Sequence, residues 1–347
     1  MKQRIVDRIL ADGPMTFDAY METCLYDPAG GFFSAGPVRS GTKGDFVTSP
    51  EISWAFGYCV GEWADTTTSR DCAALVEVGA GSGSSLSETA DLWTGRGCST
   101  YAVERSAEAR LRIASTIDDV VAVGSIADIP SGVDAVVVAN EVLDNMPAAL
   151  ARRTEGGWVE IAVNVSDGEL ALVDVPARDV TVDWCERIVG EVEPGTVVSV
   201  QLAISEWIAE VFDHFGDVSM CLIDYGATSK ELGTRSPESV VRTYRRHQAG
   251  LDWLRHPGQT DVTVDVNITG VLEAIARAGR QGHVMTQRDF VLEHGLGEII
   301  EDARDGELLA ASKGAIMHQL ENRSERINME ALIDPNGLGA FQVIIVE

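Results

Sequence analysis

The chain has 347 residues and is 45% hydrophobic, which is enough for a large buried core and predicts one elaborated domain or two. Its 54 acidic residues against 27 basic ones give a formal net charge of −27, which disfavours binding to nucleic acid and to anionic membranes. No apolar run reaches 18 residues and no histidines form a metal-spaced pair, so we expect neither a membrane span nor a metal site.

The first 67 residues predict a helical N-terminal segment. Two short helices are expected within residues 1–27, followed by a loop over residues 28–50 that is rich in Gly, Pro, Ser and Thr. Such a loop is long for a compact domain unless it has a function. A single helix is then expected over residues 51–67, with Ser49 as its N-cap.

Residues 68–347 predict one α/β domain in which strands and helices alternate. This alternation implies a parallel sheet with right-handed crossovers. Two insertions interrupt it: one near 148–200, which contains a β-hairpin, and a polar, irregular one at 229–262. In chain order, strands are expected at 73–78, 100–104, 120–123, 134–139, 158–165, 169–175, 218–224, 282–285 and 341–346, and helices at 84–93, 106–116, 201–214, 268–279, 287–295 and 301–330.

A glycine turn and a following acid predict a nucleoside-binding site. Residues 75–83 are Leu-Val-Glu-Val-Gly-Ala-Gly-Ser-Gly, with glycines at Gly79, Gly81 and Gly83, and Glu104 ends the next expected strand. Glycine lets the backbone approach a ligand, and a carboxylate can accept hydrogen bonds from both ribose hydroxyls. The Gly-x-Gly-x-Gly spacing and the lack of a basic residue nearby favour S-adenosylmethionine over a dinucleotide. A structural turn or another nucleotide is the alternative.

Polar residues also follow two buried strands at the expected carboxyl edge of the sheet. Asn140 and Glu141 come directly after Val-Val-Val-Ala, where a methyltransferase-like sheet faces the transferring methyl group. An ordinary helix cap by Asn140 is the alternative. Asp224-Tyr225-Gly226 ends another apolar strand and is expected at the same cleft. A basic stretch with Tyr244 and His247 is expected near that cleft or in a solvated loop.

These motifs together resemble the MidA-like family of S-adenosylmethionine-dependent protein arginine methyltransferases, whose mitochondrial members help assemble respiratory complex I. The family usually has a turn such as Gly-Pro-Gly-Arg-Gly, whereas this chain has Gly-Ala-Gly-Ser-Gly. The resemblance implies a Rossmann-like class I methyltransferase fold with a helical N-terminal segment and β-hairpin and helical insertions. The stretches that carry it are Met15-Thr-Phe-Asp-Ala-Tyr-Met, Tyr26-Asp-Pro-Ala-Gly-Gly-Phe-Phe, Gly44-Asp-Phe-Val-Thr-Ser-Pro-Glu, Val76-Glu-Val-Gly-Ala-Gly-Ser-Gly, Ala139-Asn-Glu-Val-Leu-Asp-Asn-Met-Pro, Ile223-Asp-Tyr-Gly and Arg242-Thr-Tyr-Arg-Arg-His-Gln.

The expected reaction is in-line attack of a substrate nitrogen on the sulfonium methyl group, with positioning contributing most of the acceleration. Because a guanidinium stays protonated, carboxylates must fix its orientation. The expected catalytic residues are Glu51, Glu141 and Asn140. The expected cofactor-binding residues are Asp45, Thr48, Ser49, Gly79, Gly81, Gly83, Glu104 and Asn140.

The expected partner is an arginine-bearing protein segment, drawn to the acidic surface, and a homodimer stays open. Two alternatives to the protein arginine reaction remain: methylation of a small molecule, and a non-catalytic assembly factor that binds the cofactor. Six scattered cysteines without Cys-x-x-Cys spacing indicate reduced thiols and predict a cytoplasmic location.

Overall fold

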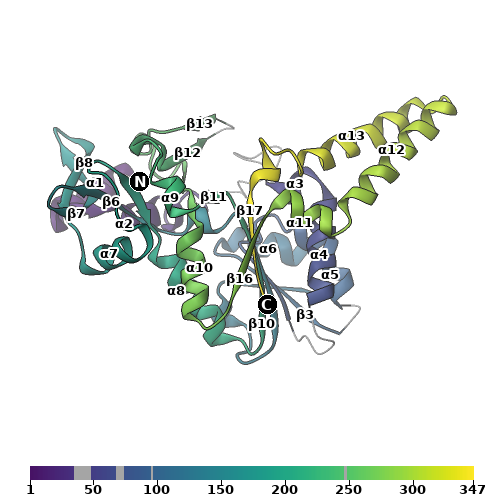
Figure 1. Cartoon of the computed structure of the whole chain (residues 1–347), viewed down its shortest axis with the longest axis horizontal. Helices are drawn as coiled ribbons and strands as arrows, with labels where there is room; N and C mark the ends of the chain where they lie inside the picture. Colours follow the sequence, from purple (N-terminus) through teal and green to yellow (C-terminus); the bar gives the residue numbers. More distant parts are fainter. Residues whose placement is uncertain (35–47, 68–73, 95–96, 246–247) are drawn as a thin grey trace.

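A seven-stranded sheet forms the centre of the molecule (Figure 1). The computed structural model describes all of residues 1–347 except 35–47, 68–73, 95–96 and 246–247. The strand order is β16-β17-β10-β5-β2-β3-β4; β10 to β4 run parallel, and β17 and β16 add antiparallel at one edge. The predicted parallel α/β sheet is confirmed. Its strands are β2 (Ala74–Val78), β3 (Ser99–Val103), β4 (Val120–Val123), β5 (Ala135–Asn140), β10 (Val218–Asp224), β16 (Gly282–Thr286) and β17 (Gln342–Val346).

Helices cover both faces of the central sheet. In β5, Val136 and Val138 pack into one core, and Val137 and Ala139 pack into the other, because alternate side chains of a strand point to opposite faces. This burial on both sides explains why the strands are almost wholly apolar. The first core includes α4 (Trp54–Thr67), α5 (Ser84–Thr94), α6 (Ala107–Thr116) and α11 (Gln287–Glu293), and the second includes α8 (Leu202–His214) and α10 (Ile268–Arg277).

A second sheet lies beside the first, at the left of Figure 1. Its central strand β7 pairs with β1, β6 and β8, and β6 pairs with β9, all antiparallel. The predicted hairpin is confirmed as β7–β8, but β1, β6 and β9 were not predicted. The elements are α1 (Lys2–Asp12), β1 (Met15–Thr16), α2 (Phe17–Tyr26), β6 (Ala149–Thr154), β7 (Gly157–Ser166), β8 (Glu169–Pro176), α7 (Asp179–Trp184), a π-helical turn (Cys185–Val189) and β9 (Val197–Val200).

The stretch 229–262 was predicted to be irregular, and this is wrong. It contains the short helix α9 (Ser229–Leu232) and the strands β12 (Val241–Arg245), β13 (Gln248–Gly250) and the first residues of β14 (Asp261–Val264). The three strands pair as a small antiparallel sheet. The buried residues Val241, Val262 and Val264 join the core formed by α1, α2 and β7. Their strands are too short for the alternation to stand out among polar neighbours. The two-residue strands β11 (Gly226–Ala227) and β15 (Val266–Asn267) pair alongside.

The helix predicted over residues 51–67 is interrupted. A short helix α3 (Ser49–Ile52) ends at Ser53, whose backbone is extended, and α4 begins at Trp54. The N-cap is Thr48, not Ser49, because Thr48 and Glu51 form a reciprocal capping box. Ser49 is instead fully buried, and its hydroxyl donates to the side-chain oxygen of Gln287 at 3.0 Å.

The long C-terminal helices α12 (Leu296–Ser312) and α13 (Ile316–Ala331) form a hairpin that projects from the body at the upper right of Figure 1. Only the residues at its base, including Leu296, Ile300 and Met329, join the core of the central sheet. Among the residues with described structure, no helix combines the length and the apolar character that crossing a membrane requires.

Candidate active site

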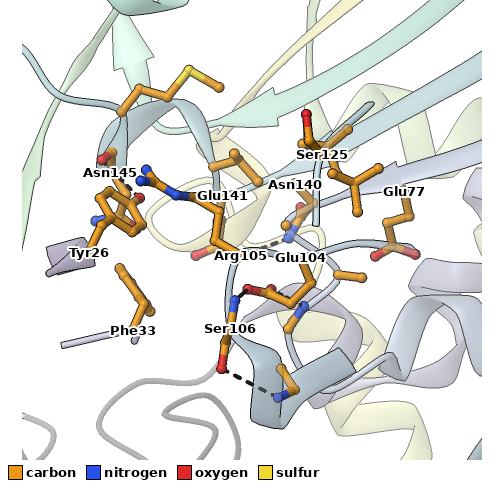
Figure 2. Close-up of a pocket in the computed structure, with 18 of the residues that line it drawn as sticks. Tyr26, Phe33, Glu77, Glu104, Arg105, Ser106, Ser125, Asn140, Glu141 and Asn145 are labelled. Atoms are coloured by element: carbon orange, nitrogen blue, oxygen red, sulfur yellow. Dashed lines mark hydrogen bonds between the residues drawn. The ribbon is translucent and has the colours of Figure 1, made fainter. Parts of the chain in front are cut away.

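A cavity of about 630 Å³ opens at the carboxyl ends of the central strands (Figure 2). This volume is typical of sites for cofactors and small ligands. Its walls come from the turn after β2, the ends of β3 and β5, helix α8, and the N-terminal segment. The parallel strands β2, β3 and β5 end at one edge of the sheet, and this arrangement brings Gly79, Glu104 and Glu141 together.

The glycine turn is fixed by its backbone conformation and by close packing. Gly79 has φ +69°, and a Cβ atom there would lie 2.4 Å from Cγ2 of Val142, in the turn after β5. Gly83 has φ +80°, and a Cβ atom there would lie 2.7 Å from Cδ1 of Ile117. Only glycine adopts this conformation freely and leaves room for these neighbours. Gly79 therefore joins two walls of the cavity, whereas Gly83 serves packing against α6.

Glu104 lies in the cavity wall between two backbone donors. Its Oε2 accepts the N–H of Gly81 at 3.0 Å, and its Oε1 accepts the N–H of Ser106 at 2.8 Å. Since a carboxylate has about four lone-pair positions, two bonds leave acceptor capacity facing the cavity. The arrangement holds the carboxylate rigidly and suits a ligand with neighbouring hydroxyls.

Glu141 lies opposite, in a backbone conformation that is rare for its residue type. Its φ is +51°, and its N–H donates to the carbonyl of Ile223 on β10 at 2.8 Å. Burial raises the pKa of its carboxyl to about 8, and the nearby acids Asp144 and Glu51 add to the rise. From the described residues the carboxyl accepts two long hydrogen bonds, each of 3.4 Å, from the N–H of Ser49 and from the amide of Asn140. Strained and poorly solvated acids of this kind cluster at functional sites.

Asn140 supplies a buried acceptor that lacks a partner. Among the residues that the structure describes, its Oδ1 makes no hydrogen bond, although Asn140 lines the cavity. An unpaired buried acceptor costs free energy unless a donor reaches it. A ligand with an amino or hydroxyl group would satisfy it, so the wall fits the donor-rich S-adenosylmethionine.

Further acids near the cavity were missed or misplaced by the sequence analysis. Glu77, inside the apolar strand β2, lines the cavity, and burial raises its pKa to about 8. Asp224 and Tyr225 do not line the cavity but support the turn after Glu141. The Oδ2 atom of Asp224 accepts the N–H groups of Leu143 and Asp144 at 2.9 and 3.1 Å, and the hydroxyl of Tyr225 donates to Asp144.

The structure therefore places some of the predicted site residues in the cavity wall and others behind it. Glu51 lies behind: its Oε1 accepts the hydroxyl of Ser82 at 3.2 Å, and its Oε2 accepts the N–H of Thr48 at 3.2 Å. Asp45 and His247 fall outside the described residues, and Tyr244 does not line the cavity. The predicted residues in the wall are Thr48, Gly79, Gly81, Glu104, Asn140 and Glu141, whereas Ser49, Glu51 and Gly83 lie outside it.

The sequence profile of a family described as "Putative S-adenosyl-L-methionine-dependent methyltransferase" matches residues 57–286. The chain belongs to this family. Its cofactor is S-adenosylmethionine, and its fold is the Rossmann-like class I methyltransferase fold. A solved structure from Burkholderia thailandensis, described as a COG1565 superfamily member and "likely methyl transferase" bound to S-adenosyl-homocysteine, superposes with a TM-score of 0.86 at 25% identity. The match covers 100% of this chain and 91% of that one.

Relatives of this methyltransferase with curated names support the same assignment. The protein arginine methyltransferase NDUFAF7 homolog of Caenorhabditis elegans is 29% identical over 88% of this chain and 79% of its own length. The Danio rerio protein arginine methyltransferase NDUFAF7 is 27% identical over 97% of this chain and 84% of its own length. Both are named as mitochondrial proteins, which contradicts the cytoplasmic location predicted from the cysteines.

Proposed function

We propose that this methyltransferase transfers the methyl group to an arginine of a protein segment, with Glu141 as the carboxylate that faces the guanidinium. The observation that carries the proposal is the strained backbone of Glu141, which holds a poorly solvated acid in the cavity wall. The relatives named as protein arginine methyltransferases support the same acceptor.

The chemistry of the acceptor explains what the acid does. A guanidinium has a pKa above about 12 and carries no free lone pair, so a carboxylate must orient it and take up the proton it releases. With no cation beside it, the carboxyl of Glu141 is largely protonated at neutral pH, because burial raises its pKa to about 8. An arriving guanidinium lowers that pKa and ionises the acid. Glu51 is the proposed second carboxylate, one layer behind.

The remaining site residues have proposed roles in holding the cofactor, which supplies an electrophilic methyl group when bound. Glu104 would accept the ribose hydroxyls, the Gly79 and Gly81 backbone would permit close approach, and Asn140 would receive a donor. Thr48 would contribute a hydroxyl from the opposite side. Ser49 and Gly83 would act only by positioning their neighbours, and Asp45 remains a proposal.

We also propose how the chain is organised for a protein acceptor. Residues 1–67 and the insertions near 148–200 and 229–262 would together grip the segment, and the methyltransferase domain would span residues 68–347. The net charge of −27 favours a basic segment and makes its capture weaken with salt.

The test compares protein methyl-arginine, by mass spectrometry, in cells with and without this gene. Reintroduced wild-type protein should restore the lost methyl-arginine, whereas Glu141→Gln should reduce transfer by at least about a hundredfold, as loss of a central electrostatic group does. Glu321→Gln, exposed on α13, is the charge-matched control and should restore methylation fully.

Two results would contradict the proposal. One is a methylated small molecule that disappears with the gene while protein methyl-arginine is unchanged. The other is full turnover by Glu141→Gln, which would remove Glu141 from its role. Binding of S-adenosylhomocysteine by that variant, measured by calorimetry, separates a lost reaction from a lost fold.

A further inference from the structure

A guanidinium already lies at the mouth of the cavity. It belongs to Arg105, the residue that follows Glu104, and its central carbon is 3.8 Å from the centre of the Tyr26 ring. Its two terminal nitrogens donate to the two carboxylate oxygens of Glu22, at 2.6 and 3.3 Å. Glu22, Tyr26 and Arg105 all line the cavity. Figure 2 shows Tyr26 and Arg105.

The partners of Arg105 form a general arginine-binding arrangement. A carboxylate that meets the guanidinium fork with both oxygens, together with an aromatic face, selects arginine over lysine. Glu22 and Tyr26 both come from α2, whereas Arg105 reaches them from the end of β3. The Arg105 and Glu22 side chains are 53% and 46% exposed, and ion pairs this exposed are weak. The Glu22 carboxylate is therefore accessible to a cation from outside the chain.

The same arrangement adjoins the turn that carries Glu141. The Tyr26 hydroxyl donates to the carbonyl of Asn145 at 3.1 Å, and Asn145 also lines the cavity. The ring of Phe33 stacks on that of Tyr26 at 5.8 Å and extends the apolar side of the mouth. An arginine bound between Glu22 and Tyr26 would thus lie at the rim of the cavity whose wall holds Glu141.

We propose that Glu22 and Tyr26 form an arginine-binding subsite, which Arg105 fills until an arginine of the substrate segment displaces it. This inference rests on the proposed function, since it takes the acceptor to be an arginine-bearing protein. Arg105 is then an internal competitor that keeps the mouth filled in the absence of substrate. Removing Arg105 should therefore strengthen the binding of an added guanidinium compound. If Arg105 were only a structural contact, its removal would weaken that binding or leave it unchanged.

The experiment titrates N-acetyl-arginine amide into protein saturated with S-adenosylhomocysteine, with calorimetric detection. If Arg105 occupies the subsite about nine-tenths of the time, Arg105→Ala should raise the apparent affinity about tenfold. Adding Glu22→Gln to that variant should abolish the gain, and N-acetyl-lysine amide should show none. Arg112→Ala removes the same charge from an exposed position of α6 and should bind like the wild type.

The proposal is overturned if Arg105→Ala leaves the affinity for arginine amide unchanged or lowers it, as a fixed tie between α2 and β3 would. If Arg105→Ala does not fold, Arg105→Lys keeps the charge without the fork; it should show a smaller gain, and no gain overturns the proposal. Because no methyl is transferred in this assay, Glu22-dependent binding without any protein methyl-arginine in cells would overturn the proposed function alone. Methyl-arginine without such binding would overturn the subsite alone.

Discussion

The two walls of the cavity are built in different ways. In the glycine wall, Gly79, Gly81, Glu104 and Ser106 lie within one strand–helix–strand unit, and each carboxylate oxygen of Glu104 accepts one neighbouring N–H group. In the opposite wall, the turn after β5 is assembled from residues far apart in the chain. Asp224 holds its N–H groups, and the N–H of Ser49 meets Glu141.

The difference extends to energetics. The glycine wall meets its hydrogen-bonding needs with ordinary turn geometry. The opposite wall contains a left-handed Glu141 and two buried oxygens, Asn140 Oδ1 and Asp144 Oδ1, that have no hydrogen-bond partner within the described part of the chain. Burial also raises the pKa of Asp144 to about 6. Such strain persists only where the surrounding structure enforces it. We propose that the first wall binds the cofactor and that the second takes part in the reaction. The following predictions test this contrast.

The largest effect should be a dependence of stability on pH that arises from Glu141 in the opposite wall. In the unfolded chain the pKa of Glu141 returns to its ordinary value, 4.5, whereas in the folded protein it is about 8. Between these pH values the folded state holds one more proton than the unfolded state, so the free energy of unfolding falls as pH rises. The slope is at most about 1.4 kcal/mol per pH unit for one group.

Denaturant unfolding between about pH 5 and about pH 8, a window that lies between the two pKa values, measures this slope. Glu141→Gln should flatten the curve and be more stable than the wild type at pH 8 while losing transfer. Glu77, whose pKa is also about 8, adds a second contribution that Glu77→Gln removes. Parallel curves for Glu141→Gln and the wild type would show that Glu141 is not held protonated.

The next largest effect should come from Gly79→Ala, which disturbs the junction of the two walls. Gly132→Ala is the matched control, because Gly132 has φ +75° and no atom within 4 Å of the added Cβ. The control should cost about 1 kcal/mol of unfolding free energy for its left-handed backbone. Gly79→Ala should cost about 3 kcal/mol, since its Cβ also meets Val142.

The double variant Gly79→Ala/Val142→Ala separates the two causes. Removing the Cγ atoms of Val142 relieves the clash at Gly79, so its additional cost relative to Val142→Ala alone should fall to that of Gly132→Ala. If Gly79→Ala is no worse than the control in urea unfolding, the two walls are not in tight contact.

The same contrast explains what the sequence could predict. The glycine turn and Glu104 belong to a continuous strand, turn, helix, strand and acid pattern, and Glu141 directly follows an apolar strand. The sequence therefore predicted all three as candidate site residues. The strain at Glu141 and its support by Asp224 depend on β5 and β10 being neighbours, which no local pattern shows. Glu77 was missed because a single acid inside an apolar strand does not disturb the strand pattern. Strand β9 was missed because it pairs only with the distant β6. Strand β6 forms a tight hairpin with β7, but its sequence Ala-Leu-Ala-Arg-Arg-Thr has few of the residues typical of strands.

A moderate effect is expected in the glycine wall. Glu104→Ala removes the acceptor of the Gly81 and Ser106 N–H groups and the proposed acceptor of the ribose hydroxyls. Affinity for S-adenosylhomocysteine should fall by about 1 to 3 kcal/mol, as measured by calorimetry. Glu108→Gln, exposed on α6, is the control for lost charge. If the affinity of Glu104→Ala for S-adenosylhomocysteine is unchanged, Glu104 does not bind the cofactor, and the role proposed for the glycine wall is contradicted.

The smallest effect concerns Glu51, which lies behind the opposite wall and has two candidate roles, as a helix cap and as a second carboxylate for the substrate guanidinium. Its carboxylate completes the capping box with Thr48. In Glu51→Gln the amide keeps an acceptor for the Thr48 N–H but loses the negative charge that stabilises a helix N-terminus. Glu51→Gln should therefore cost about 1 kcal/mol of stability.

Glu231→Gln is the matched control, because Thr228 and Glu231 form the same capping box at α9, outside the cavity wall. If both variants lower the melting temperature but only Glu51→Gln slows methyl transfer, Glu51 acts on the substrate as proposed. If methyl transfer by Glu51→Gln is unchanged, Glu51 is a helix cap alone. Glu141 is then the one carboxylate of the opposite wall that is proposed to contact the substrate guanidinium.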